Sequence, residues 1–328
     1  MAWETTPAVA TVVMALVFLP RYLRGAFSTL PEFFEDRYDA ATRRAASCLL
    51  LFSYVVIALP AGCLYPGAVA VNRIFDVPAL LGVSPQAGLW ISVWFIGLVG
   101  AAYAVFGGLK AVAVSDTANG VGLLIGGLMV PVFGLLALGG GDIAAGLRHV
   151  LDTAPEKLNA IGSASDPVPF GTIFTGMILA HLFYWGTNQA VIQRCLGARS
   201  LAEGQKGVLL SGFFKILVPL VMLVPGVIAW HLLPGLENPD HAYPALVAAV
   251  FPKVLIGFFA AVLFGAVLST YDSILNSAAT LFCLDLYKPL VRPTIDDATL
   301  IRRAKQVTVA MALVTMCVAP FKIGRAHV

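Results

Sequence analysis

Long runs of apolar residues dominate the sequence and decide what kind of protein it can form. A helix needs about twenty residues to cross the hydrocarbon core of a bilayer, which is about 30 Å thick. Most of the apolar runs reach that length, and they lie near residues 2–21, 45–72, 86–106, 111–138, 170–192, 207–233, 251–284 and 304–319. With 59% hydrophobic and 12% charged residues, the chain cannot form a water-soluble particle. The sequence therefore predicts an all-α integral membrane protein with about eight transmembrane helices.

The basic residues are divided unevenly between alternate loops, and this division predicts the orientation. Cytoplasmic loops of membrane proteins are enriched in lysine and arginine. One set of loops carries fourteen basic residues: Arg21, Arg24, Arg37, Arg43, Arg44, Lys110, Arg194, Arg199, Lys206, Lys288, Arg292, Arg302, Arg303 and Lys305. The opposite set carries Arg73, Arg148, Lys157 and Lys253. We therefore expect the first set in the cytoplasm and the first helix to run inward.

Motifs of soluble enzymes and of nucleic-acid-binding proteins are absent from the sequence. It contains no HExxH and no GxSxG motif, and its five cysteines are scattered without a CxxC pair. The net charge of +3 is interpreted as a signal of membrane topology, and no basic stripe carries interleaved aromatic residues. An intramembrane hydrolase stays open as an alternative, although the sequence places no nucleophile beside a base. We expect a protein that is not an enzyme, has no organic cofactor and binds no nucleic acid.

Four ionisable residues fall inside the predicted spans: Glu4, Asp116, Lys215 and Asp272. A charge in the hydrocarbon region is costly, and such residues usually face a cavity, a partner or an ion path. The alternative for Glu4 and Asp116 is a position near a helix end, from which the side chain reaches the interface. Lys215 lies roughly 13.5 Å beyond Lys206 at 1.5 Å per residue, which is far for that alternative. A functional role is therefore the preferred interpretation of Lys215.

The run 251–284 combines membrane-grade hydrophobicity with a polar stripe. Small and polar residues recur there at spacings of three and four: Ala266, Ser269, Ser273, Asn276, Ser277 and Thr280. Close packing of membrane helices would explain much of this pattern. Ser269 and Thr270 follow the carbonyl of Ala266 by one turn, so that three oxygens lie on one helix. An alkali cation needs such oxygens once it has lost its water, although a second, broken helix would have to complete the site.

Four motifs, in order along the chain, resemble the sodium/solute symporter family, which includes the sodium/glucose cotransporters. They are FLPRYLRGAFSTLPEFFEDRYD (18–39), YAVFGGLKAVAVSDTANGVGLLIGG (103–127), FYWGTNQAVIQRCLGARSLAEGQKG (183–207) and FGAVLSTYDSILNSAATLFCLDLYK (264–288). The last is similar to the ALSS...LNS...TLFTLDIY signature of that family, and the resemblance covers residues 1–319.

The resemblance implies a LeuT-type architecture, in which two inverted five-helix repeats surround a midplane site where the first and sixth core helices are broken. The eight apolar runs would then be core helices two to nine. We expect a fragment, with residues 1–319 forming a partial transmembrane domain that lacks the first and last core helices. The tail 320–328 is expected to be artefactual, because Lys322–Val328 (KIGRAHV) back-translates into a common sequencing adapter.

The resemblance also implies a sodium site. The Ala266 carbonyl and the Ser269 and Thr270 hydroxyls would be ligands, and Thr270 keeps the oxygen of the serine that the family has at its position. Asp116, in the segment VSDTANG, matches an acidic residue near the sodium exit path. We expect Asp116 to act along that path rather than as a ligand.

The substrate site implied by the resemblance involves five residues. Glu4 follows a tryptophan and precedes the FLP motif, as the sugar-contacting glutamate does in bacterial sodium/sugar cotransporters. Lys215 resembles the lysine of their FLK motif. Tyr184 and Trp185 would be the inner aromatic gate and its neighbour, stacking under a sugar ring. His181 stands where sugar-binding members have asparagine, so the identity of the solute stays open.

The resemblance therefore implies sodium-coupled symport of a small polar solute, most simply a sugar, by alternating access across the inner (plasma) membrane. The alternatives are a sodium symporter for an amino acid or organic acid, and a non-transporting sensor built on the same fold. The partners are the solute, the sodium ion and the lipid bilayer. The pair Asn188 and Gln189 is expected to be structural.

Overall fold

The computed structural model describes residues 2–153, 155–159, 161, 168–236 and 241–321. Every regular element within these ranges is a helix, which confirms the predicted all-α class. Seven stretches are long and apolar enough to cross a membrane: Pro7–Arg24, Ala40–Asn72, Pro85–Gly107, Val112–Leu138, Leu201–Leu232, Lys253–Leu290 and Asp297–Phe321. The segment Lys322–Val328, predicted to be artefactual, lies outside the described residues.

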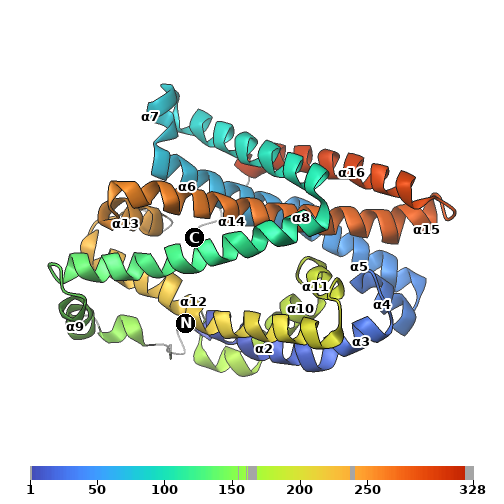
Figure 1. Ribbon diagram of the computed structural model, residues 1–328, viewed down its shortest axis with the longest axis horizontal. Helices are drawn as coiled ribbons and strands as arrows, with labels where there is room; N and C mark the ends of the chain where they lie inside the picture. Colours follow the sequence, from blue (N-terminus) through green and yellow to red (C-terminus); the bar gives the residue numbers. More distant parts are fainter. Residues whose placement is uncertain (1, 154, 160, 162–167, 237–240, 322–328) are drawn as a thin grey trace. The chain divides into compact units, whose positions relative to one another are not determined.

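Figure 1 shows the helices in chain order. The α-helices are α1 (Ala2–Thr5), α2 (Pro7–Val13), α3 (Leu19–Arg24), α4 (Leu30–Arg37), α5 (Ala40–Phe52), α6 (Tyr65–Phe75), α7 (Val77–Leu81), α8 (Pro85–Leu138), α9 (Ile143–Thr153), α10 (Gly176–Thr187), α11 (Gln189–Leu196), α12 (Leu201–Leu232), α13 (Ala242–Val250), α14 (Lys253–Thr280), α15 (Lys288–Leu290) and α16 (Asp297–Val318). The π-helical segments are η1 (Met14–Phe18), η2 (Ser53–Ala58), η3 (Pro60–Leu64) and η7 (Leu281–Tyr287), and the 3-10 segments are η4 (Pro155–Leu158), η5 (Phe170–Phe174) and η8 (Ala319–Phe321).

The fifth predicted run, 170–192, does not form one continuous helix. Helix α10 ends at Thr187, Asn188 has extended backbone, and α11 begins at Gln189. The side-chain oxygen of Asn188 accepts a hydrogen bond from the backbone N–H of Ala190 and caps α11. Apolar length alone predicted a single crossing here and was wrong in that respect. The family resemblance predicted a break in this helix, and the structure has one.

The third and fourth predicted runs, 86–106 and 111–138, belong to the single helix α8 of 54 residues. A straight helix of that length would extend about 80 Å, more than twice the thickness of the bilayer core. Two separate stretches of α8, Pro85–Gly107 and Val112–Leu138, are each long and apolar enough to cross a membrane, and the ribbon bends between them (Figure 1). Two adjacent glycines, Gly107 and Gly108, lie at that place in the sequence, and small residues favour sharp helix bends. The predicted loop is therefore replaced by a bend.

Wide π-helical turns interrupt several membrane helices, and the apolar pattern could not predict them. In such a turn the backbone hydrogen bonds shift by one residue, which changes the direction of the following side chains. In η1 the carbonyl of Ala15 accepts a hydrogen bond from the side chain of Gln205 at 3.0 Å. The interruption thus creates an anchoring point for α12.

The chain divides into two compact units. The first comprises the described residues of Met1–Pro20, Val121–Thr187 and Ala198–Val262. The second comprises those of Arg21–Gly120, Asn188–Gly197 and Leu263–Val328. Each unit combines segments that are far apart in the sequence, and each is described by itself below.

In the first unit, α2 packs against both α10 and α12. Gly212 of α12 faces α2 so closely that a β-carbon at this position would overlap the hydroxyl of Thr11. Small residues permit such close approach between membrane helices. The N-terminal helices, which carry Glu4, are thereby held against the helices that carry His181 and Lys215.

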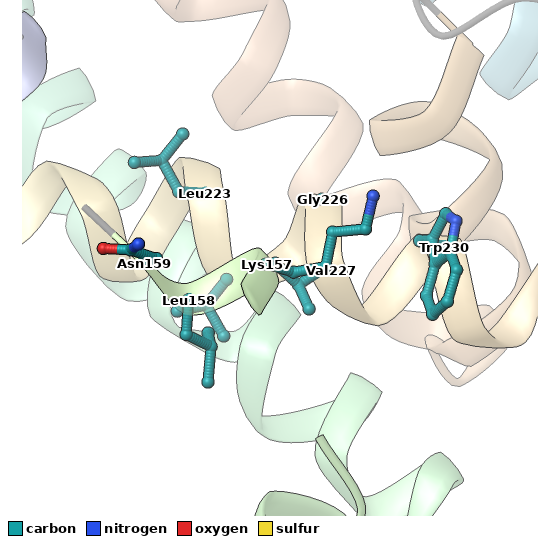
Figure 2. Close-up of a pocket in the computed structure, with 8 residues that line it drawn as sticks. Lys157, Leu158, Asn159, Leu223, Gly226, Val227 and Trp230 are labelled. Carbon is teal, nitrogen blue, oxygen red and sulfur yellow. The ribbon is translucent and has the colours of Figure 1, made fainter. Parts of the chain in front are cut away.

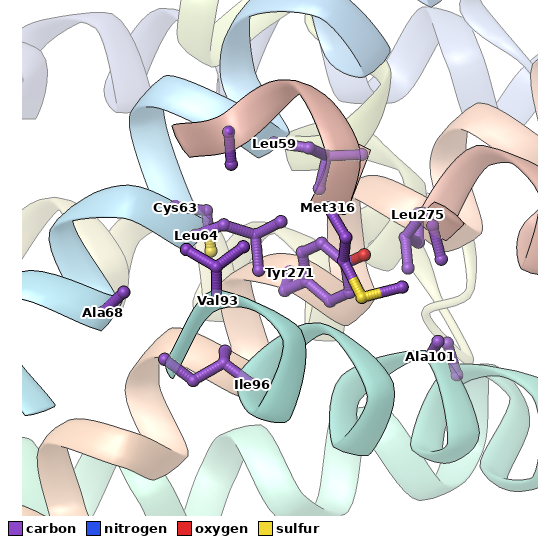
Figure 3. Packing of buried hydrophobic residues seen from close by; sticks show 13 residues of the cluster. Leu59, Cys63, Leu64, Ala68, Val93, Ile96, Ala101, Tyr271, Leu275 and Met316 are labelled. Carbon is purple, nitrogen blue, oxygen red and sulfur yellow. The ribbon is translucent and has the colours of Figure 1, made fainter. Parts of the chain in front are cut away.

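A hydrophobic cluster fills the centre of the second unit (Figure 3). Its members come from η3, α6, α8, α14, α16 and neighbouring residues: Leu59, Cys63, Leu64, Ala68, Val93, Ile96, Ala101, Ala104, Tyr271, Leu275, Ala312, Met316 and Ala319. The hydroxyl of the fully buried Tyr271 shares a hydrogen bond with Thr315 Oγ1 at 3.0 Å. The cluster fixes α14, and with it the polar stripe, against four other elements.

Carboxylate caps define where two of the membrane helices begin. Asp39 accepts a hydrogen bond from the backbone N–H of Thr42 at 2.7 Å, and Asp296 accepts one from Thr299 at 2.9 Å. These backbone hydrogen bonds favour the charged carboxylate, so the pKa of each aspartate lies below its ordinary value. The capped ends lie next to basic residues of the predicted cytoplasmic loops.

We expect the substitution Gly146→Ala to loosen the contact between α9 and the end of α8. A β-carbon at Gly146 would overlap the carbonyl oxygen of Leu135, and backbone cannot move aside as a flexible side chain can. Overpacking of this kind costs about 1–3 kcal/mol. Thermal unfolding in detergent, followed by helical circular dichroism, measures the loss. Gly207→Ala is the control, because nothing lies within 4 Å of its β-carbon, and equal midpoints for the two variants would contradict the prediction.

Candidate functional site

The polar stripe of α14 forms a hydrogen-bonded face within the second unit. Thr270 Oγ1 donates to the carbonyl of Ala266 at 3.0 Å, and Ser273 Oγ donates to that of Ser269 at 2.5 Å. Ser277 continues the pattern by donating to Ser273 at 2.9 Å. Hydroxyls that bond one turn back along a helix keep their oxygens at the helix surface. The stripe is therefore a row of oxygen atoms, as the sequence spacing predicted.

The three residues predicted as sodium ligands lie close together on this face. The Thr270 hydroxyl and the Ala266 carbonyl are hydrogen-bonded neighbours, and Thr270 is exposed. Ser269 Oγ donates its hydrogen to a carboxylate oxygen of Asp116 on α8, so its lone pairs are not used by this hydrogen bond. The arrangement offers up to three neutral oxygens. A hard cation with about six ligands would need the remainder from other groups.

Asp116 has a second partner that sequence reasoning missed. Arg194 of α11 donates from Nε to Asp116 Oδ2 at 3.0 Å, and its Nη2 contacts the same oxygen. The side chains are 18% exposed for Asp116 and 35% for Arg194. The sequence analysis counted Arg194 with the cytoplasmic basic residues. Two features of the sequence could have predicted the pair. Asp116 is an acid within a predicted span that lacks an assigned counter-charge, and Arg194 is a basic residue shortly after the break at Asn188.

Helix α11 is anchored throughout its length within the second unit. Tyr54 donates to the side-chain oxygen of Asn188 at 2.6 Å, and the backbone N–H of Leu30 donates to the buried Gln189 at 2.8 Å. Gln193 donates to Thr280 Oγ1 of α14 at 3.2 Å. These contacts agree with the structural role expected for Asn188 and Gln189.

The first unit brings together the residues predicted to bind substrate. Lys215 Nζ lies 3.9 Å from a carboxylate oxygen of Glu4 and 5.0 Å from the centre of the Trp185 ring. Tyr184 and Trp185 meet edge to face, with ring centres 5.3 Å apart. His181 is buried and lies in the electrostatic field of both Glu4 and Lys215. A carboxylate, an ammonium, an imidazole and two aromatic rings thus share one region, where they provide donors, acceptors and an apolar platform.

A separate pocket of about 340 Å³ lies against α12 in the same unit (Figure 2). Its wall consists of Lys157, Leu158, Asn159, Leu223, Val224, Gly226, Val227 and Trp230. Lys157 Nζ lies 5.2 Å from the centre of the Trp230 ring. None of the residues predicted to bind sodium or solute lines this pocket. Its mostly apolar wall, with Lys157 and Trp230 at one end, is typical of the region where a membrane meets water.

The chain is similar to known proteins over almost its whole length. A family model described as "Sodium:solute symporter family" matches residues 1–324. The chain is 47% identical over 321 residues to the uncharacterized symporter YidK of Escherichia coli (strain K12), covering 98% of this chain and 56% of that protein. It is 29% identical over 346 residues to the sodium/glucose cotransporter of Vibrio parahaemolyticus, and the match covers 98% of this chain and 62% of that protein. It is 28% identical over 363 residues to the sodium/myo-inositol cotransporter of Mus musculus, and the match covers 97% of this chain and 48% of that protein.

A solved structure has the same fold. It is a Na+-coupled sialic acid symporter in a substrate-bound, outward-open state, with a TM-score of 0.82 and 19% sequence identity. The match covers 97% of this chain and 67% of that chain. It confirms the predicted inverted-repeat transporter fold.

The chain spans about half the length of the curated relatives it matches, between 48% and 62%. The family and these relatives are transporters, which confirms the prediction that the protein is not an enzyme. The membrane-length helices agree with a multi-pass membrane protein. With the family model matching almost every residue, the chain belongs to the sodium:solute symporter family.

Proposed function

We propose that this protein acts in the sodium-coupled symport of a small neutral polyhydroxyl solute, a sugar or a cyclic polyol, across the bacterial inner membrane. The observation that carries the proposal is the cluster of Glu4, Lys215 and Trp185 in the first unit. Support comes from the relatives, whose names give glucose and myo-inositol as solutes.

The charges of the cluster favour a neutral solute. Glu4 and Lys215 offset each other at 3.9 Å, so a solute that carries a net charge would meet no uncompensated partner there. A polyhydroxyl ligand offers both donors to the carboxylate and acceptors to the ammonium, and its apolar ring face suits an aromatic side chain such as Tyr184 or Trp185. The alternatives are an organic acid, whose net charge would disturb this balance, and an amino acid, a zwitterion without net charge that the uptake measurement below distinguishes from a polyol. His181 adds a further hydrogen-bonding group and helps to select among solutes.

The proposed sodium ligands are the Ala266 carbonyl and the Ser269 and Thr270 hydroxyls. Their support is the row of neighbouring oxygens on α14 and the orientation of the Ser269 hydroxyl towards Asp116. In this proposal Asp116 lies on the path of the leaving ion. Further ligands come from groups outside this set.

Transport follows by alternating access. Sodium and solute bind from outside, the site closes, and the ion leaves to the cytoplasm after the aromatic gate at Tyr184 moves aside. Each elementary charge that moves inward through 100 mV contributes about 2.3 kcal/mol, which corresponds to roughly fifty-fold accumulation of solute per ion. The break between α10 and α11 follows Tyr184 by four residues, so the gate is next to a point where the backbone can change direction.

We expect Thr270→Val to weaken sodium-driven uptake, because valine keeps the shape of threonine and removes the proposed ligand oxygen. The apparent sodium affinity should fall about tenfold or more, since a lost ligand to a charged group is worth about 1.5–3 kcal/mol. The measurement is sodium-dependent uptake of labelled sugars, polyols, amino acids and organic acids into vesicles containing the full-length gene product.

Thr308→Val is the matched control, because the Thr308 hydroxyl also donates one turn back along its helix, at 2.9 Å, but it lies on α16. Its uptake should keep the sodium dependence of the unaltered protein. Equal sodium affinity in the two valine variants would remove Thr270 from the site. Uptake of an amino acid or organic acid in place of a sugar or polyol would overturn the solute assignment.

A further inference from the structure

Asp116 is shared between a proposed sodium ligand and a permanent positive charge. Its Oδ1 accepts the hydrogen bond from Ser269 Oγ, and its Oδ2 accepts the hydrogen bonds from Arg194. Each carboxylate oxygen is therefore engaged by a different partner. A change in the charge of one partner acts on the other partner through the shared carboxylate.

The guanidinium of Arg194 also contacts the oxygen stripe directly. Its Nη2 donates to Ser273 Oγ, which in turn donates to the carbonyl of Ser269. Its Nη1 donates to the carbonyl of Ala190 on its own helix at 3.3 Å. Arg194 is thus held at Ser273, which lies one helical turn beyond the proposed sodium ligand Ser269 on α14.

The electrostatic consequence concerns how tightly sodium can bind. An arginine in a protein is always charged, and it cannot give up its proton to adapt to a second cation. The ion pair of Arg194 with Asp116 has no net charge. A sodium ion at Ser269 therefore meets neutral oxygens and a carboxylate whose charge the arginine already offsets. Without the arginine, the charge of Asp116 would be uncompensated, and Asp116 is hydrogen-bonded to the proposed ligand Ser269. A negative charge so close to the ion strengthens sodium binding, because a partly buried site screens charges poorly.

We propose, on the basis of the sodium-symport function above, that Arg194 is a positioning residue that competes with sodium for Asp116 and limits the affinity of the sodium site. The competition keeps binding weak enough for rapid release to the cytoplasm. The competition also couples sodium binding to α11, the helix that follows the break at Asn188. A bound ion attracts the Asp116 carboxylate and so weakens its hold on Arg194 of α11. A purely structural anchor would have no such effect on the ion.

Direct sodium binding tests this proposal without relying on transport. The purified full-length protein is titrated with sodium chloride at constant ionic strength, with choline as the replacing cation, and the sodium-dependent rise in its unfolding temperature gives an apparent Kd. Arg194→Gln is expected to lower that Kd about tenfold, because it releases Asp116 to the sodium site. Arg194→Lys, which keeps the charge, should stay near the original Kd. Lys206→Gln, which removes an exposed charge paired with Glu203, is the control and should leave the Kd unchanged.

Variants of Asp116 separate competition from simple charge repulsion. Asp116→Asn leaves the arginine uncompensated and should raise the sodium Kd. In that background the arginine has no carboxylate to compete for, so adding Arg194→Gln should lower the Kd by less than it does in the unaltered protein, and an equal fall in the two backgrounds would overturn the competition. Arg194→Met replaces Arg194→Gln in both backgrounds if the glutamine variant does not fold. An unchanged or raised Kd on removing Arg194 in both backgrounds would overturn the inference while leaving symport intact. An unaltered protein that is not stabilised by sodium would overturn the proposed function itself.

Discussion

Replacing Arg43 by alanine is expected to destabilise the second unit by about 3–5 kcal/mol, because it leaves the buried carboxylate of Asp285 without its cationic partner. Asp285→Ala should cost less, because Arg43 keeps its ion pair with Glu35. Asp285 is fully buried in η7 and lies 2.7 Å from Arg43 Nη2 of α5. The carboxylate also accepts a hydrogen bond from Thr29 at 2.8 Å, and Arg43 binds Glu35 at 2.5 Å. The network therefore joins α4, α5 and η7 across long sequence separations.

The measurement is thermal or denaturant unfolding in detergent, followed by the loss of helical circular dichroism. The control is Lys206→Ala, which removes the exposed pair with Glu203 and should cost less than about 1 kcal/mol. The double variant Arg43→Met with Asp285→Leu should recover much of the loss, since an apolar pair leaves no buried charge. An Arg43→Ala variant as stable as Lys206→Ala would show that the buried pair does not hold these elements together.

The membrane crossings could be predicted from the sequence because apolar length is a local property. The stretch that became α12, for example, needed no partner to be recognised as a span. The limits of the helices were harder, because they depend on single residues. Asn188 ends one helix and caps the next, and the Gly107 and Gly108 pair allows a bend where a loop was predicted. Apolar length does not distinguish these cases.

In the candidate sites, too, local features could be predicted from the sequence and contacts between distant residues could not. The oxygen row of Ala266, Ser269 and Thr270 follows from helical spacing within one segment, so the sequence was sufficient. The pairing of Asp116 with Arg194 joins residues 78 positions apart, and that of Arg43 with Asp285 joins residues 242 positions apart. A single sequence contains the charges but no record of which ones meet. The resemblance to a family was needed to place Glu4 and Lys215 in one site.

Asp272 is the ionisable residue of the predicted spans that belongs to neither proposed site. It was counted with Glu4, Asp116 and Lys215 as a charge inside a span, and no role was predicted for it. The structure buries it fully, and within the described part of the chain neither of its carboxylate oxygens has a hydrogen-bond partner. It lies against Gly100 of α8, where a β-carbon would come within 3.3 Å of its Oδ1. A buried carboxyl without partners is costly, so it reduces the stability of the unit that contains it.

Removing the positive charge of Lys215 is expected to give the largest loss of solute binding. Lys215→Met keeps most of the side-chain volume but removes the ammonium, and a hydrogen bond from a charged group is worth about 1.5–3 kcal/mol, or roughly 10- to 100-fold in affinity. The measurement is the solute concentration that gives half-maximal sodium-driven uptake. Lys206→Met on the same helix is the control, because its ammonium pairs with Glu203 at the exposed surface and should leave that concentration unchanged.

The double variant Glu4→Gln with Lys215→Met distinguishes two roles of the pair. If both groups bind the solute, removing both weakens uptake at least as much as the worse single change, because two sets of hydrogen bonds are lost. If the two charges served mainly to neutralise each other at 3.9 Å, the double variant would recover, since neither charge would then be left alone. We expect no recovery, because Lys215 also lies over Trp185, where a bound ring would meet both groups. Full recovery of uptake would assign the pair to folding and move the solute site elsewhere.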